Sequence, residues 1–166
     1  MPKPIDPVPS NGECERIVQA YSTGVLVMCQ GFVPYAVPMN HAWSEGRLYF
    51  HCAPTGRKLD VIRANSRVCY VINGCFGQPG DLADPRKCHG NWESVIAYGR
   101  ARVPEDAEER RQAFLVFGRY YNRDFELSEE AATTTSAIIL EVETMTARRE
   151  APGQPVDYWS WARQGE

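Results

Sequence analysis

Residues 47–60 read RLYFHCAPTGRKLD, a strand pattern followed by a turn and then by the start of a helix. Side chains along a strand alternate between its two faces, so Leu48, Phe50 and Cys52 are predicted to face the core. His51 then points to the opposite face. It lies near the end of the strand, where a ligand could meet it.

A helix is predicted directly after this strand, because Pro54 ends the strand and Thr55 is a favoured helix cap. Its first residues would be Gly56, Arg57 and Lys58. A helix start offers unpaired backbone N–H groups and a partial positive charge, and a glycine lets an anion approach the main chain. The two cations could bracket a single phosphate. It stays open from these residues alone whether they are instead surface cations paired with nearby acids.

The composition is that of one globular domain: 166 residues, of which 43% are hydrophobic and 23% charged, with a net charge of −3. No basic stripe with interleaved aromatic residues is present, so we expect no nucleic-acid partner. The apolar runs are too short to cross a bilayer, and residues 1–13 lack the apolar stretch of a signal peptide. We therefore expect a cytoplasmic protein that does not enter a membrane.

The six cysteines form no C-x-x-C pair, and Cys29, Cys52 and Cys69 lie within apolar strand patterns. Buried, reduced thiols are therefore expected instead of a disulfide framework. No cysteine and histidine cluster has the spacing of a zinc site, so we expect no metal.

The pattern along the chain predicts a small, mostly antiparallel barrel with peripheral helices. Residues 1–11 are rich in proline and are predicted to form a flexible arm. Helices are expected at 12–22, capped by Asn11, at 55–64, and from Pro104 to about residue 123. Strands are expected at about 25–30, 35–43, 47–53, 67–73, 92–103 and 136–147.

Two stretches, PMNHAWSEGRLYFHCAPTGRKLDVIRANSRVC (38–69) and CHGNWESVIAYGRA (88–101), are together similar to one known family. They resemble the flavin-binding split-barrel family related to pyridoxamine 5′-phosphate oxidase, and more narrowly its Nim-type nitroimidazole-resistance reductase branch. The resemblance covers residues 12–149. It implies a mainly β fold, a six-stranded antiparallel split barrel with two or three peripheral helices, which forms a homodimer with two FMN molecules at the subunit interface.

The resemblance also assigns positions to the flavin. The phosphate would lie at the start of the helix that follows residue 55. The isoalloxazine would lie along the strand that ends near residue 40, and a segment near residue 93 would close the site from the other subunit. The assigned positions are Pro38, Met39, Asn40, His51, Ala53, Gly56, Arg57, Lys58, Trp92, Glu93 and Ser94.

Three features depart from the family pattern. Ser66 replaces a common proline, and Ala147-Arg148 replaces a common Gly-Lys. The tail, residues 150–166, carries Trp159 and Trp161, which would face the same way in an extended chain. They could pack over a neighbouring subunit or cap the flavin ring, or they could anchor the tail to the protein's own surface.

The predicted function is that of an FMN-dependent oxidoreductase. It would take hydride from a nicotinamide and pass it to a small nitro- or quinone-type acceptor. His51 is the candidate for proton delivery, and His41 is the second candidate, because histidine titrates near neutral pH. FAD could replace FMN as the flavin. The sequence is also compatible with a non-catalytic flavin-storage protein, or with a haem-binding protein that uses His41, His51 or His89 as axial ligand. The glycine-rich segment 73–91 could be a lid over the flavin or a passive surface loop.

Overall fold

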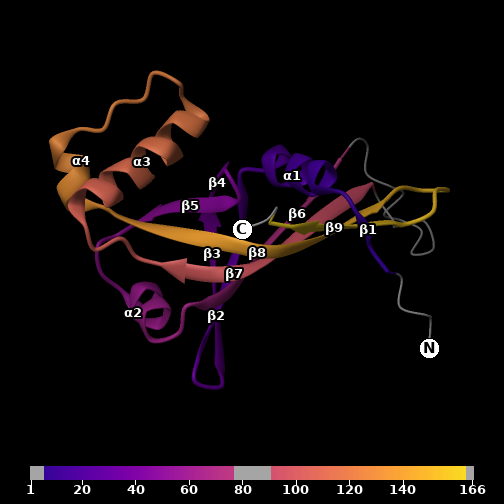
Figure 1. Cartoon of the computed structure of the whole chain (residues 1–166), viewed down its shortest axis with the longest axis horizontal. Helices are drawn as coiled ribbons and strands as arrows, with labels where there is room; N and C mark the ends of the chain where they lie inside the picture. The colour runs from indigo at the N-terminus through magenta and orange to yellow at the C-terminus, as the bar shows by residue number, and fades with distance from the viewer. Residues whose placement is uncertain (1–5, 77–90, 164–166) are drawn as a thin grey trace, which may run out of the picture.

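The computed structural model describes residues 6–76 and 91–163. Within them the chain forms four helices and nine strands (Figure 1). In chain order the elements are β1 (Val8–Pro9), α1 (Asn11–Ala20), β2 (Thr23–Gln30), β3 (Val33–Asn40), β4 (Ala42–Ser44), β5 (Arg47–Cys52), α2 (Arg57–Ala64), β6 (Arg67–Cys75), β7 (Trp92–Arg102), α3 (Ala107–Tyr121), α4 (Glu129–Thr134), β8 (Ser136–Glu150) and β9 (Asp157–Ala162).

The strands form one sheet in the order β1-β9-β8-β7-β6-β2-β3, and β5 branches from β8 and carries β4. All pairs are antiparallel except β1 with β9. Helices α3 and α4 lie together at one end of the molecule, α1 lies on the sheet, and the β2–β3 hairpin projects away from both (Figure 1). The predicted β-rich, split-barrel class is confirmed.

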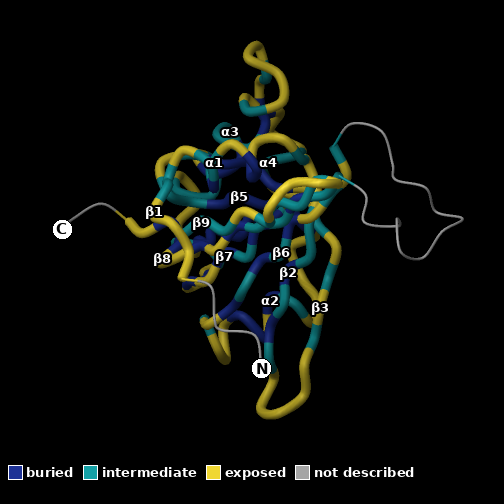
Figure 2. The backbone as a smooth tube through the Cα atoms, turned by 90° about the vertical axis from the view of Figure 1, so that its right-hand side faces the viewer, coloured by how far each residue is buried: buried dark blue, intermediate teal, exposed yellow. Residues whose placement is uncertain are grey.

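The main core lies inside the curved sheet. Leu26, Phe50, Tyr70 and Ile138 are fully buried there, together with residues of α1 and α2. Leu48, Phe50 and Cys52 face this core as predicted. Buried positions therefore concentrate where the strands and helices overlap, whereas the tip of the β2–β3 hairpin is exposed (Figure 2).

A second, smaller core lies on the other side of β5. Tyr49 is 8% exposed and packs with Phe114 of α3 and Ile139 of β8. Strand β5 is thus covered on both faces. Helix α3 packs over the face that the alternating sequence pattern did not assign to a core. Only His51, near the end of the strand, remains exposed on that side.

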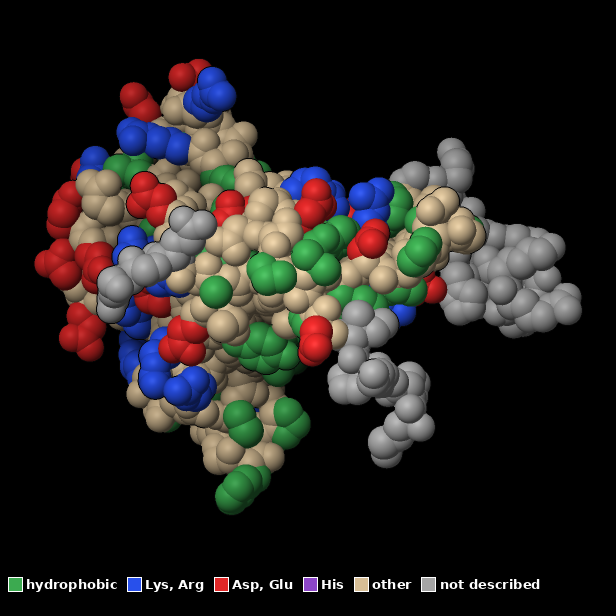
Figure 3. Space-filling view, turned by 45° about the vertical axis from the view of Figure 1, so that its right-hand side comes forward, with side chains coloured by type: hydrophobic (Ala, Val, Ile, Leu, Met, Phe, Trp, Pro, Cys, Tyr) green, Lys and Arg blue, Asp and Glu red, His purple; other side chains and the backbone are tan. Residues whose placement is uncertain are grey.

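The outer face of β2, β6 and β7 has no such cover among the described residues. Alternation along β2 buries Leu26 and Met28 and leaves Val25 and Val27 half-exposed. On β7 Tyr98 is 45% exposed, and at the hairpin tip Phe32 is fully exposed. Hydrophobic side chains also mark the projecting hairpin at the bottom of Figure 3. We call the surface of β2, β6 and β7 that carries Val25, Val27 and Tyr98 the outer sheet face.

The strand count differs from the predicted six. The predicted strand 35–43 is two strands, β3 and β4, and β1 and β9 were not predicted. Part of the tail at 150–166 pairs with β8, and part of the arm at 1–11 pairs with the tail, so both belong to the sheet. Strands of two or three residues carry too little alternation to be recognised, and a tail strand depends on an edge that only the folded sheet provides.

The helix starts also need correction. Ser10, not Asn11, caps α1 and accepts a hydrogen bond from the Glu13 backbone N–H at 3.4 Å. Helix α2 begins after Gly56 instead of Thr55, with no side-chain cap. Helix α3 begins three residues after Pro104 with Asp106 as its cap. Helix α4 was missed because six residues are too few for a helical period.

The tryptophans of the tail anchor it to the protein's own surface. Trp161 is 5% exposed, donates its indole N–H to Glu15 at 2.7 Å, and packs edge-on against Trp43 with ring centres 5.9 Å apart. Strand β9 pairs with β8 along its whole length. Trp161 therefore packs within its own chain.

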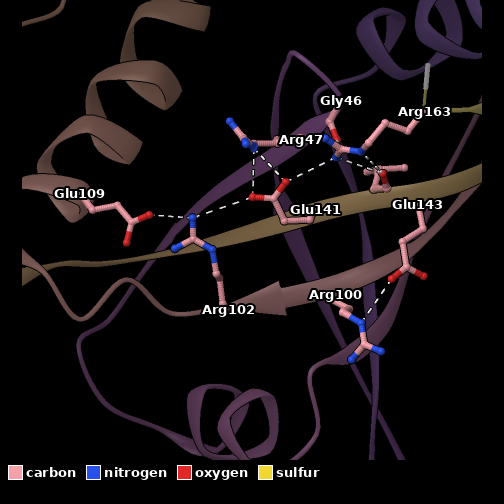
Figure 4. Close-up of polar contacts among 9 residues, drawn as sticks. Gly46, Arg47, Arg100, Arg102, Glu109, Glu141, Glu143 and Arg163 are labelled. Carbon is pink, nitrogen blue, oxygen red and sulfur yellow. Dashed lines mark hydrogen bonds and ion pairs between the residues drawn. The ribbon is translucent and has the colours of Figure 1, made fainter. Parts of the chain in front are cut away.

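A group of charged residues fastens the end of the tail. Arg163 donates to the carbonyl oxygens of Gly46 and Val142 at 2.9 and 3.1 Å. Arg47, Arg102 and Arg163 converge on the carboxylate of Glu141 (Figure 4), and Arg47 is the closest, at 2.8 Å. These arginines are therefore engaged in holding strands and tail together.

Candidate functional site

The start of α2 has the features of an anion site. Gly56 has φ = 128°, a conformation that side chains other than glycine rarely adopt, and no side chain caps the helix. A Cβ at Gly56 would meet nothing within 4 Å, so the space beside it is open. The first backbone N–H groups of the helix therefore remain available to a ligand from solvent.

Arg57 connects this helix start to β3. Its guanidinium stacks over the ring of Tyr35, 4.4 Å from the ring centre, while the side chain stays exposed. Lys58 is half-buried beside it. The predicted cations thus stand next to the strand that leads to Pro38, Met39 and Asn40. Tyr35 itself was missed by the sequence prediction, because an aromatic residue in a strand has no signal that separates ligand contact from packing.

The three predicted residues at the end of β3 divide between two faces. Pro38 and Asn40 are exposed on the outer sheet face, whereas the Met39 side chain turns inward against the main core. The Met39 carbonyl accepts a hydrogen bond from the Tyr70 hydroxyl at 2.6 Å. Only Pro38 and Asn40 can offer side chains to a flavin on the outer face.

His41 follows directly and is fully buried. Its Nε2 lies 3.0 Å from the Val18 carbonyl oxygen and its Nδ1 lies 3.1 Å from the Tyr70 hydroxyl. A carbonyl can only accept, so Nε2 carries a proton. Burial lowers the pKa of His41 from its ordinary 6.5, although the hydrogen bond to Val18 opposes that effect. His41 is a structural residue and cannot reach a ligand.

The buried His41 should make stability depend on pH. Because its pKa is lowered in the folded state, the unfolded chain binds more protons as the pH falls below about 6.5, and stability falls with it. His41→Phe orphans the Val18 carbonyl and should cost about 2 kcal/mol near pH 7.5. That cost should shrink at pH 5, when measured by urea unfolding at both pH values. A cost that is equal or larger at pH 5 would contradict this role.

Trp92, Glu93 and Ser94 begin β7, at a distance from the α2 start. Ser94 pairs with Asn73 on β6, and Thr23 of β2 pairs with Asn40 of β3. Extending the β2–β6 register by two residues beyond Val25 and Val71 brings Thr23 and Asn73 into the same row. Tyr35, beside Arg57, lies five residues further along, which is roughly 17 Å at strand spacing. One chain therefore does not bring this segment to the start of α2, which we call the α2 cradle.

Glu93 has its own partners inside the protein. It is 2% exposed and accepts hydrogen bonds from Arg16 at 2.7 and 3.2 Å and from the Tyr21 hydroxyl at 3.3 Å. Burial, and next to it the Glu93 charge, raise the pKa of Tyr21 to about 12. Trp92 lies on the other face, 4.9 Å below the Arg148 guanidinium. Only Trp92 and Ser94 present side chains that are not already held by the core.

His51 has a different environment from His41. Its ring meets the ring of Phe117 on α3 edge-on, with centres 4.7 Å apart, and the residue is exposed. Within residues 6–76 and 91–163, neither ring nitrogen of His51 has a hydrogen-bonding partner. Ala53 follows, exposed, in the turn toward Gly56. His51 is thus free to contact a ligand, and the aromatic residues of α3 beside it were missed as site residues because their spacing is that of a core-facing helix.

The described residues hold no group of three or more potential ligands that could bind a metal ion. The described cysteines are unpaired; burial raises the pKa of Cys14 to about 11 and also raises that of Cys52, so neither is an activated thiol. Cys29 and Cys69 are half-exposed on the outer sheet face instead of buried. In this part of the chain, no helix is long and apolar enough to cross a membrane. Most of segment 73–91, with Cys88 and His89, lies outside the described residues.

Solved structures share this architecture. A proposed 5-nitroimidazole antibiotic resistance protein from Bacteroides thetaiotaomicron is 25% identical and superposes with a TM-score of 0.69 over 83% of this chain and 82% of that one. A FAD-binding protein from Mesorhizobium loti is also 25% identical, with a TM-score of 0.62 over 86% of this chain and 95% of its own. A FAD- and haem-binding protein from Mycobacterium smegmatis, 14% identical with a TM-score of 0.67 over 88% of this chain and 73% of its own, shares the fold.

Among curated proteins, an uncharacterized protein of Rhizobium meliloti, RA0666, is 34% identical over 93 residues. That alignment spans 56% of this chain and about half, 54%, of the relative. The sequence profile described as pyridoxamine 5′-phosphate oxidase matches residues 10–149, which include the α2 cradle, the end of β3 and the start of β7. The chain therefore belongs to the pyridoxamine 5′-phosphate oxidase family.

Proposed function

We propose that this protein is an FMN-dependent oxidoreductase that takes electrons from NADH or NADPH and reduces a small nitro- or quinone-type molecule. The observation that carries the proposal is the uncapped start of α2, where open space beside Gly56 meets Arg57 and Lys58. A single phosphate monoester, as in FMN, matches one helix start with two cations. The relative that binds FAD supports a flavin, and the relative described as a proposed 5-nitroimidazole antibiotic resistance protein supports a nitro compound as acceptor.

Bound flavin would supply the hydride chemistry, and the chain would supply binding and orientation. Gly56 and the first N–H groups of α2 would hold the phosphate, with Arg57 and Lys58 on either side of it. Pro38 and Asn40 would lie along the ring, and His51 is free to hydrogen-bond a ligand. The unpaired cysteines suit the reducing cytoplasm, where we expect the protein to act.

The test is the visible spectrum of the purified protein. Flavin absorption that NADH or NADPH bleaches, and that a nitro compound or a quinone restores without oxygen, is expected. Chromatography of the released cofactor distinguishes FMN from FAD. Flavin that neither nicotinamide reduces would mean a storage protein and would overturn the reductase. A Soret band would indicate haem, for which His51 is the available histidine among the described residues because His41 is engaged through both ring nitrogens.

We also propose that the protein acts as a homodimer through the outer sheet face. Val25, Val27 and Tyr98 leave apolar area uncovered there, and a groove of about 340 Å³ lies between β2, β6 and β7. A second copy would also bring Trp92 and Ser94 of one subunit to the cradle of the other, which a single chain does not do. One two-fold contact would both cover the apolar area and bring Trp92 and Ser94 to the cradle of the other subunit.

Val27→Asp places a charge in the middle of this face and should weaken the dimer by tenfold or more. Light scattering should report twice 18.7 kDa for the unmodified protein and 18.7 kDa for the variant at micromolar concentration. Thr133→Asp, on exposed α4 away from this face, is the matched control and should remain dimeric. An unmodified protein of 18.7 kDa in solution would rule out the dimer.

A further inference from the structure

A pocket of about 380 Å³ lies between α3, α4 and the end of β5, apart from the α2 cradle. Its lining contains no Lys, Arg, Asp or Glu, and most of it is aromatic or aliphatic. Its lining includes His51, Phe117, Tyr121, Phe125, Leu127 and Ala131. An apolar cavity of about 150 Å³ holds benzene, so this volume suits a molecule of one or two rings.

The walls of the pocket are flat and fixed. Phe117 lies between His51 and Tyr121, with ring centres 4.7 and 5.2 Å away. Phe125 packs directly onto Gly118 of α3, where even a Cβ would lie 2.0 Å from the ring. Glycine at 118 therefore lets Phe125 lie against the helix. Flat walls of this kind favour a planar ring, because aromatic faces and edges pair with one another.

His51 is one of the polar residues at the pocket, which Asn122 and Thr135 also line. It is exposed, and within the described residues its ring nitrogens lack hydrogen-bonding partners. A carbonyl or hydroxyl group of a ligand could therefore bond to it without displacing a protein partner. Without any charged lining residue, a charged ligand would lose its hydration and gain no partner.

The pocket adjoins the predicted flavin segment. Tyr121, which lines it, donates its hydroxyl to the carbonyl of His41 and lies 3.3 Å from the carbonyl of Ser22. His41 follows Asn40 directly, so the end of α3 is fixed against the end of β3. A molecule in the pocket would thus lie next to the place proposed for the flavin ring.

We propose that this α3–α4 pocket binds an uncharged, planar aromatic or quinoid molecule of one or two rings, with His51 as its hydrogen-bonding partner. Naming this molecule as the electron acceptor rests on the proposed function. A bound flavin would supply the hydride that, with a proton from water, converts a quinone into a hydroquinone. The chain would supply the pocket that orients the quinone and the hydrogen bond from His51.

The test measures binding of 2-naphthol, which is uncharged, and 2-naphthoate, which is an anion of the same shape, by ligand-observed NMR. Ala131→Phe fills the pocket and should weaken 2-naphthol binding by tenfold or more. Ala132→Phe, the same change on the neighbouring residue, lines the cavity on the other side of α4 and should leave binding within twofold. The unmodified protein should bind 2-naphthol at least tenfold more tightly than 2-naphthoate.

Phe125→Ala gives a second readout if Ala131→Phe does not fold. It enlarges the pocket and should shift preference from 2-naphthol toward three-ring 9-phenanthrol. Equal 2-naphthol binding by Ala131→Phe and Ala132→Phe, or 2-naphthoate binding as tight as 2-naphthol, would overturn the pocket. So would an Ala131→Phe protein whose molecular mass in solution changes, because the pocket would then be a contact between copies.

The two proposals fail in different ways. One result would support the pocket and contradict the reductase: the protein proves to hold no flavin, yet it binds 2-naphthol and Ala131→Phe removes that binding. A flavin that NADH reduces, and that 2,3-dimethyl-1,4-naphthoquinone reoxidises equally fast in Ala131→Phe and Ala132→Phe, would keep the reductase and sink the pocket.

Discussion

Replacing Arg57 and Lys58 together by alanine should give a folded protein that no longer retains flavin. Each charge-assisted hydrogen bond contributes roughly 1.5–3 kcal/mol, so the loss of two should weaken flavin binding by about 100-fold or more. The free energy of unfolding should change little, because Arg57 is exposed and its described side-chain contact is the cation–π stacking over Tyr35. The measurements are the absorbance ratio of flavin to protein after purification and the affinity of the flavin-free protein for added FMN.

The matched control lies on the same helix. Arg63 is an exposed cation in the last turn of α2 and pairs with Asp60 at 3.5 Å. Arg63→Ala should keep its flavin, because the residue stands at the wrong end of the helix for an anion. A double variant that purifies with full flavin content, or an Arg63→Ala protein that loses it equally, would contradict the cradle at the start of α2.

Glu93→Ala should destabilise the protein by about 3 kcal/mol, even without flavin. The change removes a buried carboxylate that binds Arg16 and Tyr21, and breaking such a group costs roughly 3–5 kcal/mol. The lower end applies because Arg16 is 41% exposed and can return to water. Thermal unfolding of the flavin-free protein should shift down by roughly 6–12 °C.

Glu13→Ala is the comparison for this variant. Glu13 also pairs with Arg16, at 3.0 Å, but both side chains are about 40% exposed, so its loss should cost less than about 1 kcal/mol. An equal loss of unfolding free energy in the two variants would mean that the burial of Glu93 does not make its ion pair more important for stability. A Glu93→Ala loss that occurs only with flavin bound would mean that Glu93 acts through the cofactor, as the family resemblance implies.

Alternation and turn chemistry predicted much of the fold. The runs that became β5, β6 and β7 were placed within two residues, because each has a strong period of two and one face in the core. Strands β1 and β9 could not be predicted, since β9 forms only on the edge of β8 and β1 only on the edge of β9. Helix α2 was predicted, but its cap was wrong: Gly56 takes a conformation reserved for glycine, which displaces Thr55.

The candidate site was predicted unevenly for the same reason. The cluster from Gly56 to Lys58 depends on one helix start, so neighbours in sequence are neighbours in space. The side chain of Glu93 was not recognisable as structural, because its partners Arg16 and Tyr21 lie more than seventy residues away. Likewise, His41 and His51 look alike along the chain, yet one is enclosed by α1 and Tyr70 and the other faces α3.

The sequence by itself determined the strand pattern, the family and the cations at the start of α2, because each depends on residues that are close together along the chain. Only the tertiary structure decided which residues are free to bind. It enclosed His41, left His51 exposed, tied Glu93 to α1, closed the tail onto β8 and built a pocket between α3 and α4. Burial and pairing depend on segments that meet only in the fold, and the periodicity of one segment does not identify the segment that packs against it.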